Sequence, residues 1–79
     1  MWPLNTEIAM HYITGISGMR YRILAGPYKS AQAALADIER AQEAAATYHD
    51  GRFDRLEVEA IEGFNGPAAL NLRGFSAAS

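Results

Sequence analysis

The chain has 79 residues, a formal net charge of −2, 20% charged residues and no cysteine. A chain of this length forms one small domain with a thin core. The lack of cysteine excludes disulfides and thiolate metal sites, and with only two histidines we expect neither a metal centre nor a cofactor. The sequence therefore predicts a single domain over residues 1–79, with a loose N-terminus at 1–6 and a tail at 76–79.

Two segments near the N-terminus alternate as half-buried strands do. In residues 7–16 we expect Tyr12 on the buried side and Ile13 on the open side. Residues 15–18 (GISG) are small and permissive, which is typical of a hairpin connection. Residues 19–25 then alternate again, so the first half of the chain predicts a β-hairpin.

Residues 26–51 carry the start and stop signals of one long helix. Ser30 is the expected N-cap, because its hydroxyl can accept a backbone N–H of the first turn. Gly51 is the expected end, because glycine adopts the left-handed C′ conformation at no steric cost. Most of the residues between them are strong helix formers. On the apolar stripe of this helix, Leu35 and Ile38 are predicted to be the main core contacts.

Two further strands are expected after the helix. Residues 55–61 alternate clearly, and Leu70 and Leu72 predict a short fourth strand beyond a segment rich in glycine. The resulting order is ββαββ, and a helical crossover leaves the third strand parallel to the second. The sequence therefore predicts an α+β fold with a four-stranded antiparallel sheet in the order 2-1-3-4 and one long helix across one face.

Acidic residues are concentrated in the second half of the chain. Residues 37–62 contain eight acidic residues and three arginines, a charge of −5. A solvated strand face is the simple interpretation of such alternation, and a surface for a basic partner is the functional one. Fixed carboxylates could imitate phosphates to a protein surface that normally holds nucleic acid. The candidate partner-binding residues are Asp54, Glu57 and Glu59 on the open sheet face, and Glu39 and Glu43 on the outer side of the helix.

Self-association is a separate expectation. A small domain without disulfides or metals often gains stability by associating. Ile13 and Ile61 are both predicted on the open face of the sheet, where they could be buried against a second copy. We therefore expect a weak homodimer.

Catalytic and ligand-binding motifs are weak. His49 and Asp50 could act as an acid–base pair, but the sequence indicates no pocket around them. Residues 26–30 (GPYKS) open a helix as a phosphate loop does, yet Lys29 lacks the preceding glycine. Arg20 and Arg22 flank a tyrosine as in nucleic-acid binders, but the net charge opposes phosphate binding. We therefore expect no enzyme and no direct nucleic-acid binding, and an accessory nucleic-acid-binding protein remains an alternative.

A location in the cytoplasm is the default expectation. No apolar run approaches the roughly 20 residues that a membrane span requires. Nor does a basic region precede an apolar stretch, as in a secretory signal.

Residues 21–30 (YRILAGPYKS), followed by Ala34, resemble one half of a SPOR domain. Those domains carry a strand ending in Gly-Pro-aromatic, then a serine and an alanine-bearing helix. The match covers about a quarter of the chain. This resemblance implies a module that binds peptidoglycan glycans.

The whole chain is similar in its general features to small anti-CRISPR proteins of phages. The features shared are its size, its alanine-rich helix, its acidic bias, and the absence of cysteine and of a catalytic motif. This resemblance implies a non-enzymatic inhibitor that blocks DNA binding or assembly of a type I effector complex. A protein-binding inhibitor is therefore the first functional expectation, and a SPOR-like glycan-binding module is the alternative.

Overall fold

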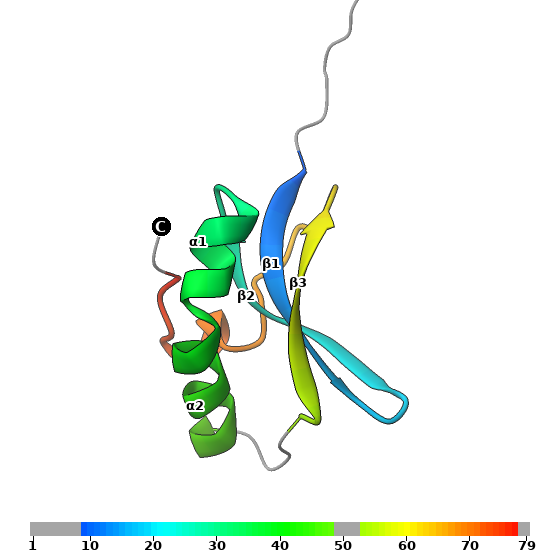
Figure 1. The fold of residues 1–79 in the computed structure, drawn as a ribbon, viewed down its shortest axis with the longest axis vertical. Coiled ribbons are helices and arrows are strands. Elements are labelled where there is room, and N and C mark those ends of the chain that lie inside the picture. Colours follow the sequence, from blue (N-terminus) through cyan, green and yellow to red (C-terminus); the bar gives the residue numbers. More distant parts are fainter. Residues whose placement is uncertain (1–8, 49–52, 78–79) are drawn as a thin grey trace, which may run out of the picture.

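The computed structural model describes residues 9–48 and 53–77, and a long hairpin lies at its centre. Strand β1 (Met10–Ser17) pairs antiparallel with β2 (Arg20–Tyr28), and Gly18 adopts a φ of 61° in the tight turn between them. A positive φ of this kind favours glycine. The tip of the hairpin projects away from the helices (Figure 1). The predicted hairpin is confirmed.

Strand β3 (Arg55–Ile61) completes a three-stranded sheet. It pairs antiparallel with β1 from Met10 opposite Ile61 to Ile16 opposite Arg55, so the strand order is β2-β1-β3. The α+β class and the order of the first three strands are therefore confirmed.

The predicted fourth strand is wrong. Leu70 precedes the 3₁₀ helix η1 (Asn71–Arg73), and Leu72 lies within it. Leu70 is buried, whereas Leu72 is 72% exposed. The segment before η1 lies against β2, on the opposite edge of the sheet from β3. There the N–H groups of Ala69 and Leu70 donate to the carbonyls of Ile23 and Leu24, at 2.9 and 2.8 Å. Side chains two residues apart lie on the same face of a strand. In the 3₁₀ turn formed here, the side chains of Leu70 and Leu72 point in different directions.

The predicted single helix is two helices. Helix α1 (Ala31–Ala36) and helix α2 (Ile38–Tyr48) are separated at Asp37, whose φ of −105° and ψ of 4° lie outside the helical region. Ser30 caps α1 as predicted, because its Oγ accepts the Ala33 N–H at 3.1 Å. The expected end at Gly51 lies outside the described residues. Both helices cover the same side of the sheet (Figure 1).

The break between the helices coincides with a buried carboxylate. The Asp37 carboxylate accepts the Tyr28 hydroxyl at 2.6 Å, the Arg40 Nε at 2.8 Å and the Arg40 Nη2 at 2.9 Å. Burial, together with this hydrogen bond, raises the pKa of Tyr28 well above its usual value. An aspartate on a continuous surface helix would point to solvent, so the inward-facing carboxylate accounts for the interruption.

The core lies between the helices and the face of β1 that carries Ile13. Ile13 is fully buried there, so its expected position on the open face is wrong. Gly15 lies on the same face, and a Cβ at this position would come within 2.8 Å of the Leu24 Cδ1 atom. The absence of a side chain at Gly15 lets the core pack closely on this face, so the face of β1 that carries Ile13 becomes the buried one. The sequence pattern predicted the wrong side because both sides of this strand carry apolar residues.

Alanine rather than leucine forms the buried stripe of the helices. Ala34, Ala41 and Ala45 are buried, and Ile38 is half-buried against the core, as predicted. Leu35 is 58% exposed, so its expected role as a main core contact is wrong. Small side chains let the helices approach the sheet closely, and the larger residues of the core come from the strands and loops.

We predict that Leu24→Ala lowers the free energy of unfolding by about 2–5 kcal/mol, because it leaves a cavity in the core. Leu35→Ala makes the same chemical change at an exposed helical position and should cost about 0.5 kcal/mol or less. Urea denaturation of both variants measures the difference. Equal losses from the two variants would contradict the packing described above.

Candidate functional site

The predicted acidic residues are divided between two surfaces. Glu57 and Glu59 lie opposite Thr14 and Tyr12 on the face of the sheet that the helices leave uncovered. Glu39 and Glu43 lie on α2, at exposed positions. The structure thus brings the helical pair to one place and the strand pair to another, as expected.

Both strand carboxylates are engaged by neighbouring side chains. The Arg55 Nε pairs with the Glu57 carboxylate at 2.7 Å, and this hydrogen bond raises the pKa of Arg55. The Tyr21 hydroxyl donates to the Glu59 carboxylate at 2.7 Å. Burial and this bond raise the pKa of Tyr21 to about 12. Neither carboxylate is therefore free to meet a partner without giving up an internal interaction, and Asp54 is the exposed acid beside them.

Part of the uncovered sheet face is occupied by the segment that follows β3. The ring of Phe64 meets the ring of Tyr12 edge-on, with centroids 5.3 Å apart and an interplanar angle of 85°. Ile61 is half-buried on this face, whereas Ile13 lies on the opposite, helix-covered face. The two isoleucines proposed for self-association therefore do not form one patch.

The helical pair of acids borders a groove between α2 and β3, here called the α2–β3 groove. Its volume is about 360 Å³. Glu39 and Glu43 are one helical turn apart, and no hydrogen bond or ion pair engages their carboxylates within the described part of the chain. The groove is lined by Glu39, Gln42, Glu43, Ala45, Ala46, Phe53 and Leu56.

Two apolar residues of this groove were not singled out from the sequence. Phe53 precedes β3 and Leu56 lies within it, and their side chains pack with the core cluster. The Arg20 guanidinium lies 4.7 Å from the centroid of the Phe53 ring. The signal in the sequence was the lone aromatic residue between two charged ones in Arg52-Phe53-Asp54.

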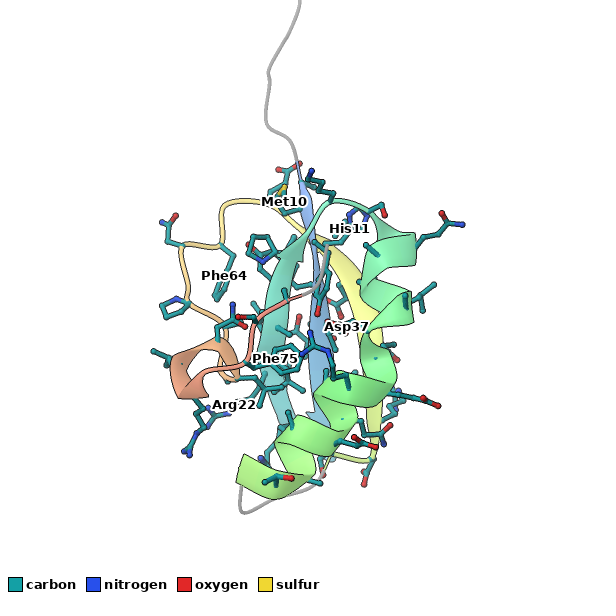
Figure 2. All side chains as sticks on the ribbon, turned by 90° about the vertical axis from the view of Figure 1, so that its left-hand side faces the viewer. Met10, His11, Arg22, Asp37, Phe64 and Phe75 are labelled. Carbon is teal, nitrogen blue, oxygen red and sulfur yellow. The ribbon has the colours of Figure 1, made fainter. Side chains whose placement is uncertain are left out.

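A larger groove of about 970 Å³ runs along the edge of β2, here called the β2-edge groove. Figure 2 shows Phe64 and Arg22 on this side of the molecule, where the C-terminal segment lies against β2. Sequence reasoning missed the site because it placed residues 70–73 at the other edge of the sheet. The groove is lined by residues 21–23 of β2 and by Phe64, Pro67, Ala69, Leu70, Leu72 and Arg73.

The other candidate motifs give no catalytic arrangement in the described residues. His49 and Asp50 lie outside them. Within residues 9–48 and 53–77, no group of three or more His, Asp or Glu side chains could hold a metal ion. Of the phosphate-loop-like stretch, Tyr28 is buried and Ser30 caps α1. Neither of the described helices is long and apolar enough to cross a membrane.

Comparison with protein-family models, with curated proteins and with solved structures found no match. The functional interpretation therefore depends on the grooves and charges described above.

The two tyrosine–carboxylate hydrogen bonds provide a matched test of burial. We predict that Tyr28→Phe lowers the free energy of unfolding by about 1–3 kcal/mol, because it leaves the buried Asp37 carboxylate with one fewer donor. Tyr21→Phe removes an exposed bond of similar length, to Glu59, and should cost about 1 kcal/mol or less. Urea unfolding measures both. A larger loss at Tyr21 would show that Asp37 does not depend on its tyrosine partner.

Proposed function

We propose that this protein is a non-enzymatic protein-binding inhibitor and that it holds a basic segment of its partner in the α2–β3 groove. The observation that carries this proposal is the pair of unengaged carboxylates, Glu39 and Glu43, at a groove that Phe53 and Leu56 also line. The two engaged acids of β3 are less suited to this role. We therefore assign the proposed binding surface to α2 rather than to the open face of the sheet.

The groove matches the two parts of a basic side chain. Lysine and arginine have an apolar stem and a cationic head, and they bury the stem while the head stays with charged groups. Phe53 and Leu56 supply apolar surface for the stem, and the two carboxylates lie where the head would be.

The anti-CRISPR resemblance suggests the kind of partner. A type I effector complex holds nucleic acid on basic protein surfaces. Two carboxylates one helical turn apart could occupy the place of neighbouring phosphates on such a surface. Attraction of this kind acts mainly on the association rate and weakens as salt is added.

We predict that the double variant Glu39→Gln and Glu43→Gln binds its partner at least about tenfold more weakly, because the cationic heads lose their counter-charges. The matched control is Glu57→Gln with Glu59→Gln, which changes the net charge equally and should bind as the wild type does. Target-DNA binding by a purified type I effector complex, measured with increasing inhibitor, tests both variants.

A second assay tests the binding groove independently of the identity of the partner. A labelled peptide of alternating lysine and leucine should bind the wild type and lose affinity only with the helical double variant. If the peptide binds in this way but the effector complex is not inhibited, the anti-CRISPR assignment is wrong and the binding groove stands. If the helical variant matches the wild type in both assays, the groove itself is wrong.

A further inference from the structure

We propose that the β2-edge groove is a second binding site, for an extended acidic peptide segment of a partner protein. The carboxylates of the peptide would pair with Arg22 and Arg73, and an apolar side chain between them would pack on Leu72 and Pro67. This site lies apart from the α2–β3 groove and would bind a ligand of the opposite charge.

The first observation is that two unengaged arginines line one groove. No ion pair, hydrogen bond or ring contact engages the guanidinium groups of Arg22 and Arg73 among the described residues. A guanidinium presents a fork of donors that matches a carboxylate. The other described arginines are occupied: Arg20 lies over Phe53, Arg40 pairs with Asp37, and Arg55 pairs with Glu57.

The second observation is the apolar surface that lines the same groove as these charges. Leu72 is 72% exposed although its neighbour Leu70 is buried, and Pro67 and Ile23 line the same groove. An apolar centre with charged groups at its margin is the usual anatomy of a protein-binding patch. The occupant therefore carries both acidic and apolar side chains.

The third observation is that the groove follows a sheet edge. β2 is an edge strand, and its outer side accepts hydrogen bonds from the turn that leads into η1, where Ala69 and Leu70 donate to Ile23 and Leu24. Extended peptides bind by adding to such edges, and their alternate side chains then reach neighbouring pockets. A peptide alongside residues 21 and 22 would add to the same edge nearer the hairpin tip, beyond the Ile23 carbonyl that Ala69 occupies.

The charges of the groove favour a peptide over a nucleic acid. Single-stranded nucleic acid is bound by stacking of its bases on aromatic rings as well as by its phosphates. At short range, the Tyr21 hydroxyl is bonded to the Glu59 carboxylate, so an anion lies beside the ring on which a base would stack. The Phe64 ring packs edge-on against Tyr12. A peptide needs only the two guanidinium groups and the apolar surface.

The test uses the full chain and a labelled peptide of alternating glutamate and leucine, followed by fluorescence anisotropy. Arg22→Gln and Arg73→Gln should each weaken binding about two- to fivefold, the effect of one exposed ion pair. Leu72→Ser should weaken it further. Arg55→Gln removes the same charge elsewhere on the surface and should leave binding unchanged. Thermal unfolding checks that each exposed substitution preserves the fold.

Three results would overturn the proposal. One is the absence of binding to the glutamate–leucine peptide. Another is an equal loss of peptide affinity with Arg55→Gln, which would show that binding depends on the net charge and not on this groove. The third is tighter binding of single-stranded oligothymidine with the same dependence on Arg22 and Arg73, which would make the ligand a nucleic acid. The Glu39→Gln and Glu43→Gln variant should bind this peptide normally, so failure here is distinct from failure of the inhibitor proposal.

Discussion

The arrangement of this small domain depends on one buried carboxylate. Asp37 lies in the core, where an unpaired charge would be strongly destabilising. It is satisfied by Tyr28 at the end of β2 and by Arg40 in α2. The Arg40 guanidinium also donates to the Ser76 carbonyl and lies 4.3 Å from the centroid of the Phe75 ring. Figure 2 shows Asp37 and Phe75 close together on the helix side of the sheet. One charge network therefore joins the sheet, the helix break and the C-terminal segment.

The two grooves follow from the packing on either side of the sheet and helices. Arg40 holds the C-terminal segment near α2, and the preceding residues are bonded to the edge of β2. The β2-edge groove forms between that segment and the strand. On the other side, the alanines of α2 pack closely on the core while its longer polar side chains remain outside. The gap between those side chains and β3 is the α2–β3 groove. The buried interaction thus helps to shape the β2-edge groove, and the alanine face of α2 shapes the other groove.

The parts of the fold that local patterns determine could be predicted, and the parts that depend on distant contacts could not. The hairpin, the Ser30 cap and the third strand follow from short stretches of sequence. The spacing of Leu70 and Leu72 predicts a strand, but the hydrogen bonds to the edge of β2 are made by a turn that leads into η1. The helix break could not be read from Asp37 alone, because an aspartate within a helical pattern normally faces solvent. Its partner Tyr28 is nine positions away, on a different element.

The candidate sites illustrate the same limit for charge. The sequence shows how many acidic and basic residues the chain has, but a binding surface depends on which of them remain unpaired after folding. Glu59 lies 38 positions from Tyr21, so their hydrogen bond depends on the strand order rather than on any motif. Pairing within the fold engages the acids of β3 and leaves those of α2, and it occupies Arg55 while leaving Arg22 and Arg73. A chain with a modest net charge can therefore present two separate grooves of opposite sign. On this argument the unpaired charges, rather than the total charge, determine which partners such a small domain can bind.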